Sequence, residues 1–330
     1  MTEAPVTDGT TSARWSPGPW TGFLLRRAGG LAAVAATLVV VTFAMIQLIP
    51  GDPAEALAGQ NATPADIARI RHELGLDRPL AVQFTDYLAG LPRGDLGRSF
   101  QTREPVADII ATRLPFTAEL AASALLLVLA IALPLGIAIA ARRSRGVDNA
   151  FTVGTGLLGA VPEYVIGTML VMIFAITLRI LPAGGAATPQ SLLLPVVAIA
   201  LPSSCVMARL VRREAGTVLA QDYIRTAHGR RLPTPRLYLR HVLPNLLPAV
   251  MTLSGLVLAS LLGGTVVVET VFAWPGIGQR VVDALLVRDY PTIQGCVLVL
   301  GLLAATLHLT VDVLISLLDP RSALMGAENR

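Results

Sequence analysis

Long apolar stretches separated by polar connections dominate the chain. Because lipid offers no hydrogen-bond partner to a bare backbone, a run of about 20 apolar residues predicts a transmembrane helix. Six stretches qualify, at residues 31–49, 116–141, 151–181, 191–211, 245–268 and 293–318. The third is interrupted at Pro162-Glu163, and its pattern fits one tilted helix as well as a broken one. The sequence therefore predicts an all-α integral membrane protein with about six transmembrane helices.

The connection between the first two spans is long and has helical patterns of its own. TPADIARIRHELGL carries apolar residues at helical spacing, and Thr63 is placed to cap this helix ahead of Pro64 and Asp66. RPLAVQFTDYLAGL carries a second helical pattern. We expect a helical hairpin here that covers the outer mouth of the protein.

Most arginines in or beside the short connections lie on one side of the predicted membrane. They are Arg26, Arg27, Arg142, Arg143, Arg145, Arg212, Arg213, Arg225, Arg230, Arg231, Arg236, Arg240 and Arg321. Cytoplasmic connections of membrane proteins carry an excess of positive charge. Both termini are therefore predicted to be cytoplasmic, and the segment between the first two spans to be extracytoplasmic.

These patterns divide the chain into four parts. Residues 1–23 are rich in Thr, Pro and Gly and are predicted to be a disordered cytoplasmic N-terminus. Residues 24–115 hold the first transmembrane helix and the extracytoplasmic segment. Residues 116–320 form a five-helix core with a cytoplasmic loop at 212–244, and residues 321–330 form a cytoplasmic tail.

Composition agrees with a membrane protein and excludes some functions. Charged residues make up 15% of the chain, against about 25% in soluble domains, and the mean hydropathy is +0.64. All 26 basic residues are arginine, so the lysine of a phosphate-binding ATPase loop is missing. Any ATP-driven step must come from another subunit. Cys205 and Cys296 lie in apolar runs without metal-ligand spacing and are predicted to be buried.

Motifs for catalysis and nucleic-acid binding are not found. The chain has no G-x-S-x-G, and the H-E-x-x-H pattern that begins at His72 is broken at Leu76. The arginines flank spans, which explains them by membrane orientation without nucleic acid. His308 and Asp312 lie four positions apart in the sixth span, where ionisable groups are costly. They fit a proton relay, but we favour a structural role, in which they pair with each other or cap a neighbouring helix near the cytoplasmic end.

A basic insert, QDYIRTAHGRRLPTPRLYLRHVLPN at residues 221–245, separates the fourth and fifth spans. It holds five arginines and one aspartate, so it is too polar to enter lipid. A helical run is followed by turns at Pro233 and Pro235 and by a second run that leads back into the membrane. A short helix held across the cytoplasmic face between two spans predicts a docking device for a partner.

This insert resembles the coupling loop of binding-protein-dependent ABC importer permeases. The family pattern is E-A-A, three residues, Gly, nine residues and I-x-L-P. Arg225-Thr226-Ala227 stands at E-A-A, and His241-Val242-Leu243-Pro244 stands at I-x-L-P with the same spacing. One position departs: Arg231 stands where the family has glycine, and a glycine occurs two residues earlier, at Gly229.

Further stretches resemble the dipeptide, oligopeptide and nickel permease family, in its first permease subunit type. They are IPGDPAEAL, LGLDRPLAVQF, GDLGRSF, RLPFTAEL, VETVFAWPGIGQRVVDALLVRDYPTIQG and VDVLISLLDPR. The resemblance covers about residues 24–322 and implies a type I ABC importer fold of the MetI-like kind. It implies a subunit that is no enzyme and moves di- and oligopeptides into a bacterial cell across the plasma membrane by alternating access.

The resemblance also implies partners and site residues. The partners are a homologous second permease, two ABC ATPases that use ATP and Mg²⁺, an extracytoplasmic substrate-binding protein and membrane lipid; this chain itself holds no cofactor or metal. The implied ATPase-docking residues are Tyr223, Arg225, Thr226, Ala227, Gly229, Arg231, Leu232, Leu243 and Pro244. The implied outer-mouth residues, on the binding-protein side, are Trp274, Pro275, Gly276 and Gly278.

Two alternatives remain open at this point. In the first, the same machine carries nickel or another small solute, because specificity in such importers rests mostly with the binding protein. A proton-coupled secondary transporter would use His308 and Asp312, but the inverted repeats expected of one are not visible.

Overall fold

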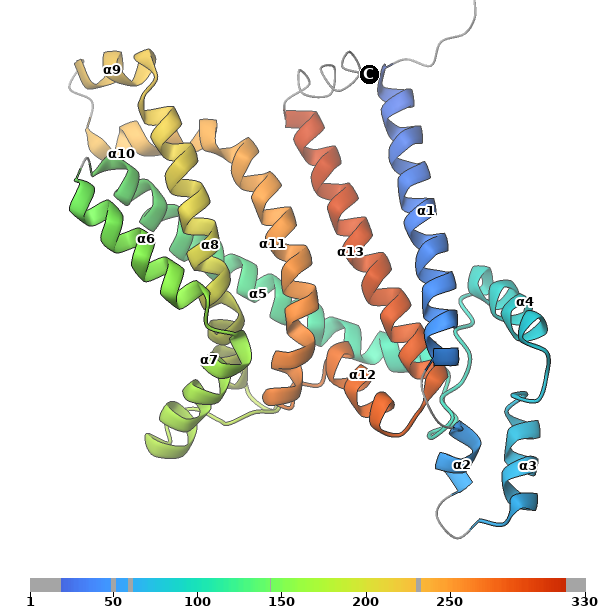
Figure 1. Ribbon diagram of the computed structural model, residues 1–330. Helices are drawn as coiled ribbons and strands as arrows, with labels where there is room; N and C mark the ends of the chain where they lie inside the picture. The colour runs from blue at the N-terminus through green and yellow to red at the C-terminus, as the bar shows by residue number, and fades with distance from the viewer. Residues whose placement is uncertain (1–18, 49–51, 59–61, 143, 230–232, 319–330) are drawn as a thin grey trace, which may run out of the picture.

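The protein is an open assembly of long helices (Figure 1). The computed structural model describes residues 19–48, 52–58, 62–142, 144–229 and 233–318. The long helices are α1 (Pro19–Leu48), α5 (Val106–Ala141), α8 (Leu193–Leu219), α11 (Leu243–Val271) and α13 (Tyr290–Leu318). The shorter ones are α2 (Pro53–Ala58), α3 (Pro64–Glu73), α4 (Leu80–Gly90), α6 (Arg145–Gly159), α7 (Glu163–Leu170), α9 (Asp222–Gly229), α10 (Thr234–Leu237) and α12 (Ile277–Leu286). No strand occurs among the described residues.

Five helices of the described chain are apolar and long enough to cross a membrane, which confirms the predicted all-α membrane fold. They lie in α1, α5, α8, α11 and α13. The third predicted span is broken: α6 and the stretch Glu163–Thr177 meet at an angle of 84°. Pro162 stands at the break. Proline lacks an N–H and disfavours helical geometry in the residue before it, so the helix ends there.

Helix bounds differ from the predicted spans at both ends of the chain and in the middle. The last five residues of the predicted N-terminal tail, 19–23, belong to α1, while residues 1–18 and 321–330 lie outside the described residues. Helix α5 begins at Val106, ten residues before the predicted span, because Val106, Ile109 and Ile110 bury a helical stripe. Helix α8 continues to Leu219, into the predicted loop.

The centre of the fold is the pair α5 and α8, which pack along much of their length. At Gly136 the backbones approach so closely that an added Cβ would lie 2.7 Å from Val211 and 2.8 Å from the carbonyl oxygen of Ala208. A side chain at Gly136 would force the helices apart. Cys205 and Cys296 are both buried, as predicted.

The segment between α1 and α5 is helical, but it does not form the predicted hairpin. Thr63 caps α3 through a reciprocal capping box with Asp66, as the sequence predicts. Helix α3 packs on α2, where Arg71 forms an ion pair with Asp52. Helix α4 instead lies against α1, with the ring centroids of Phe43 and Phe84 5.0 Å apart. We call α2, α3 and α4 the outer segment.

Two groups of short helices lie at opposite ends of the long ones (Figure 1). Helices α9 and α10 lie at the same end as the start of α1 and the end of α13; we call it the loop end. The outer segment and α12 lie at the other end, which we call the outer-segment end.

Candidate docking and outer-mouth sites

A buried carboxylate organises the turn between α11 and α12. Glu269 has no exposed surface although α11 is a membrane-spanning helix. Its carboxylate accepts hydrogen bonds from the Thr117 hydroxyl at 2.7 Å and from the backbone N–H of Gln279 at 3.0 Å. The Thr117 oxygen in turn accepts from the backbone N–H of Ile277 at 2.9 Å. An anion at the start of α12 is favourable because unpaired N–H groups and the positive end of the helix dipole meet there.

The predicted outer-mouth residues belong to this same turn. Trp274 is buried, and its indole N–H donates to the carbonyl oxygen of Phe116 at 3.0 Å. A Cβ on Gly276 would lie 2.3 Å from the Glu269 carboxylate, and a Cβ on Gly278 would lie 2.5 Å from the backbone of Val266. The two glycines therefore let the chain wrap closely around the carboxylate.

The buried position of these residues limits how they can act. Trp274, Gly276 and Gly278 are buried in this chain, and Pro275 is partly buried. Their packing holds α12 onto α5, so any influence on the outer mouth passes through the placement of α12. Their role toward a binding protein stays a prediction.

A second buried carboxylate, on Asp289, lies between α12 and α13. It accepts hydrogen bonds from the Ser99 hydroxyl at 2.6 Å and from the backbone N–H of Phe100 at 2.8 Å. The Thr292 hydroxyl adds a bond of 2.8 Å, and the guanidinium of Arg280 lies 3.6 Å away. Asp289 thereby ties the strap before α5, residues 97–105, to the start of α13.

Sequence reasoning did not single out Glu269 or Asp289. Both lie inside the stretch VETVFAWPGIGQRVVDALLVRDYPTIQG, whose resemblance to a family does not by itself indicate which side chains are buried. The available signal was an acidic residue bordering an apolar run with Thr, Gly and Trp nearby, since buried carboxylates need several hydrogen-bond donors.

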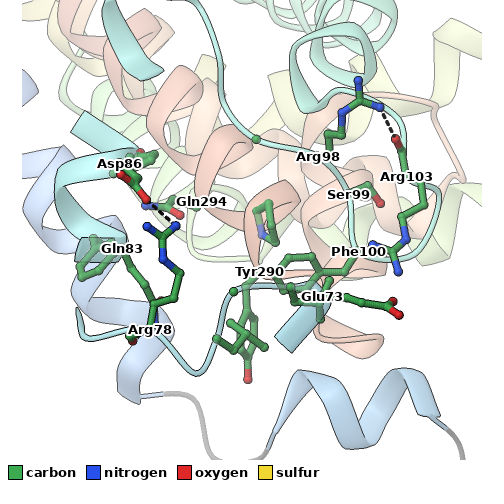
Figure 2. A pocket seen from close by; sticks show the side chains of 17 residues that line it. Glu73, Arg78, Gln83, Asp86, Arg98, Ser99, Phe100, Arg103, Tyr290 and Gln294 are labelled. Atoms are coloured by element: carbon green, nitrogen blue, oxygen red, sulfur yellow. Dashed lines mark hydrogen bonds and ion pairs between the residues drawn. The ribbon is translucent and has the colours of Figure 1, made fainter. Parts of the chain in front are cut away.

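A pocket of about 410 Å³ opens at the outer-segment end between α4, the strap and the start of α13 (Figure 2). Its charged lining residues are Glu73, Arg78, Asp86, Arg98 and Arg103. Arg78 forms an ion pair with Asp86 at 2.7 Å, and the Arg98 guanidinium donates to the carbonyl oxygen of Arg103 at 3.2 Å.

The floor of this pocket holds polar groups with spare hydrogen-bonding capacity. Gln294 is 7% exposed, and its side-chain nitrogen has no hydrogen-bond partner within the described chain. The Tyr87 hydroxyl also has none that meets hydrogen-bond geometry, although Thr42 and Gln294 are its neighbours. Burial raises the pKa of Tyr87, so the phenol stays neutral and can donate. The pocket is therefore suited to a polar group presented from outside.

At the loop end, α9 is held by its apolar side and shows a polar side to the exterior. Ile224 and Ala227 are buried in the main core. Tyr223 is 44% exposed, and Thr226 and Gly229 are exposed. This is the pattern of an amphipathic helix seated on the ends of the long helices.

The predicted docking residues divide according to this arrangement. Tyr223, Thr226, Gly229 and Pro244 are exposed at the loop end, Leu243 is partly buried and Ala227 is buried. Arg231 and Leu232 lie outside the described residues, as does the side chain of Arg225. The exposed members are placed for contact with a partner, and their role in docking stays a prediction.

The candidate proton relay in α13 is described only in part. His308 is exposed and makes no hydrogen bond to the described residues, while the side chain of Asp312 lies outside them. Both explanations of the pair, a relay and a structural pairing, stay untested.

Comparison with known proteins places the chain in a family. Residues 132–323 match the model of the binding-protein-dependent transport system inner membrane component, and residues 21–121 match the corresponding N-terminal model. A putative peptide transport system permease of Brucella suis is 39% identical, covering 91% of this chain and 98% of the relative. A probable D,D-dipeptide transport system permease of Escherichia coli is 38% identical, covering 92% of this chain and 98% of the relative.

A third relative and a solved structure agree. A glutathione transport system permease of Salmonella typhimurium is 38% identical, covering 90% of this chain and 97% of the relative. An inward-facing structure of the MetNI methionine ABC transporter aligns with a TM-score of 0.53 at 16% identity, covering 64% of this chain and 96% of the solved chain. The chain therefore belongs to the family of inner membrane components of binding-protein-dependent transport systems, and it has the MetI-like permease fold.

Proposed function

We propose that this chain is the first permease subunit of an ATP-driven importer that moves di- and oligopeptides into the cell. The observation that carries the proposal is α9, which is anchored by buried Ile224 and Ala227 and leaves Tyr223 and Thr226 exposed. The segment around it joins α8 to α11, two membrane-spanning helices. A force applied to α9 by a partner would reach both helices.

The proposed partner at the loop end is a pair of ABC ATPases. They would bind ATP and Mg²⁺ in place of this chain, which lacks the phosphate-loop lysine. Closure of the ATPase pair would draw the docking loops of two permeases together. The spans would then alternate between inward- and outward-facing states, with chemistry confined to the ATPases.

The proposed partner at the outer-segment end is a substrate-binding protein that delivers peptide. The pocket of Figure 2 supports this, because it gathers arginines above buried polar groups that have no hydrogen-bond partner within the described chain. A homologous second permease would complete the pathway. The broken span supports that partner, since Leu157 is 70% exposed and Ile176 63% exposed in this single chain.

The proposed location is the plasma membrane of a bacterium, with both termini in the cytoplasm. The arginine distribution supports this orientation. The start of α1, the end of α13 and α9 lie at one end of the molecule, as a shared cytoplasmic side requires (Figure 1).

The proposed cargo rests on the names of the similar permeases. They are named for transport of peptides, a D,D-dipeptide and glutathione. These names favour peptides over nickel. Membership in a binding-protein-dependent family favours an ATP-driven importer over a proton-coupled carrier that works alone.

Uptake measurements test the proposal directly. Labelled dipeptides, oligopeptides, glutathione and nickel would be supplied in parallel to cells lacking only this chain and to cells with it restored. We expect peptide uptake to return with the chain and to disappear when the ATPase is inactivated, while an uncoupler alone leaves ATP-supported uptake in place. Normal peptide uptake in the deletion together with a nickel deficit would refute the cargo.

Docking is tested separately by co-purification of the ATPase. Arg225→Glu is expected to weaken ATPase association, because it reverses a charge in the predicted contact. Arg231→Gly restores the family residue and is expected to preserve or raise transport-coupled ATP hydrolysis. Arg98→Glu, the same charge reversal at the outer-segment end, is the control. Unchanged ATPase recovery with Arg225→Glu would remove that residue from the contact.

A further inference from the structure

A groove lies between α1 and α13 toward the loop end. The two helices come together toward the outer-segment end and separate toward the loop end (Figure 1). At the close point, a Cβ on Gly301 would lie 2.7 Å from the Leu38 side chain. Near the loop end, a Cβ on Gly30 would have no neighbour within 4 Å. The separation leaves a groove of about 550 Å³.

The groove has an apolar wall and a basic end. Its apolar and small lining residues are Gly30, Leu31, Val34, Leu38, Gly301, Ala304, Ala305 and Leu309. Its remaining lining residues are Arg26, Arg27 and His308, and none of the lining residues that the structure describes carries a carboxylate. A ligand that fits must therefore combine a hydrocarbon part with an anionic head.

The basic residues lie at one depth on the two helices. Arg26 stands about 33 Å along α1 from its outer end at Leu48, and His308 about 27 Å along α13 from Tyr290, at about 1.5 Å per residue. The hydrocarbon core is about 30 Å thick. Arg26 and His308 therefore both reach the boundary between acyl chains and headgroups at the loop end.

We propose that this groove binds an anionic phospholipid, with its phosphate on Arg26, Arg27 and His308 and an acyl chain along the Gly30–Gly301 wall. Basic pockets between transmembrane helices on the cytoplasmic side suit anionic headgroups. The lipid supplies a hydrogen-bond acceptor to His308, whose side chain is exposed at membrane depth and has no partner among the described residues. Assignment of this end to the cytoplasmic leaflet rests on the proposed orientation; the lipid contact itself does not.

Lipid binding by the purified full-length chain tests whether the groove selects an anionic headgroup. The chain in detergent micelles would be titrated with phosphatidylglycerol or with phosphatidylcholine of the same acyl chains, and bound lipid counted by native mass spectrometry. We expect phosphatidylglycerol to bind more tightly. The double variant Arg26→Gln and Arg27→Gln should weaken its binding about 30-fold, since each arginine near the membrane surface contributes about fivefold.

A matched double variant separates this site from general basic charge. Arg142→Gln and Arg145→Gln removes two exposed arginines near the start of α6, outside the groove. It should bind phosphatidylglycerol like the unchanged chain. Equal weakening by the two double variants would overturn the proposal, as would equal binding of the two lipids by the unchanged chain.

A pair of glycines tests the shape of the groove without changing charge. Gly30→Leu fills the groove from α1, whereas Gly29→Leu introduces the same side chain one position away, off the lining. Neither Cβ meets a neighbour, and leucine favours helix over glycine, so both variants should fold. Gly30→Leu should lose phosphatidylglycerol binding and Gly29→Leu should keep it.

A protein occupant is the remaining alternative, and a cross-link detects it. Ala304→Cys places a thiol in the groove wall. In membranes we expect this cysteine to react with a lipid-soluble maleimide and to form no cross-link to another chain. A specific cross-link to a partner permease would show that protein fills the groove and would overturn the lipid assignment.

Discussion

Polar side chains are buried at one end of the molecule and exposed at the other. At the outer-segment end, Glu269 and Asp289 are buried carboxylates whose oxygens accept hydrogen bonds from the same chain. At the loop end, α9 buries only its apolar side and leaves polar groups exposed. The hydrogen bonds of the outer turn are completed within one polypeptide, whereas the loop end leaves a polar helix face exposed.

This difference separates residues that shape the permease from residues available for contact. Substitutions around Glu269 should act through folding and the placement of α12. Substitutions on the exposed side of α9 should leave the fold alone and act on association. Four experiments test this difference between the two ends.

The largest effect is expected from Glu269→Ala. It leaves the Thr117 hydroxyl and the Gln279 N–H without their acceptor in a buried site, at a cost of about 3 kcal/mol in the free energy of unfolding. Chemical unfolding in detergent micelles measures this loss. Glu104→Ala, which removes an exposed carboxylate in the strap, should change it by less than about 0.5 kcal/mol. Equal stabilities of the two variants would refute the structural role of Glu269.

A smaller loss is expected from Gly276→Ala. The new Cβ would lie 2.3 Å from the Glu269 carboxylate, so the turn or the carboxylate must shift, at about 1–3 kcal/mol. Gly263→Ala in α11 is the control, because a Cβ there meets nothing within 4 Å. The control should be neutral or slightly stabilising. Thermal unfolding of both variants measures the difference in stability. An unchanged stability of Gly276→Ala would show that the turn is looser than the structure indicates.

On α9, the double variant Tyr223→Ala and Thr226→Ala is expected to keep stability within about 0.5 kcal/mol while lowering ATPase co-purification. Ile224→Ala on the buried side of the same helix should instead cost about 3 kcal/mol. Measuring stability and association together separates the two sides of α9. Full association of the ATPase with the double variant would mean that this face is not the contact.

The smallest effect is expected at an exposed pair in the outer segment. The hydrogen bond from His72 to Asp77, at 2.6 Å, raises the pKa of His72 above its ordinary value of 6.5. Because the folded-state pKa is the higher one, the stabilisation is fully present below pH 6.5 and is lost as pH rises through the folded value. Asp77→Asn should lower the His72 pKa in an NMR titration. An unchanged pKa would show that the pair does not form in solution.

Local patterns in the sequence predicted much of the architecture. The apolar runs located the spans, and Thr63 with Asp66 located the start of α3, because capping depends on residues close in the chain. The hairpin of α3 and α4 was not formed, since the aromatic contact of α4 with Phe43 and the ion pair of α3 with Asp52 join residues far apart in sequence.

Patterns along the chain were enough to establish the membrane class and the approximate helices, and they predicted an external ATPase and a docking loop. The membrane class and the helices follow from hydropathy, the predicted external ATPase from the absence of lysine, and the predicted docking loop from the spacing of its motif. None of these properties depends on how the chain packs. The 84° break, the burial of Trp274 and the hydrogen-bond partners of Glu269 and Asp289 instead depend on packing between distant segments. Thr117 is 152 residues from Glu269 and Ser99 is 190 from Asp289, so helix packing alone brings each pair together.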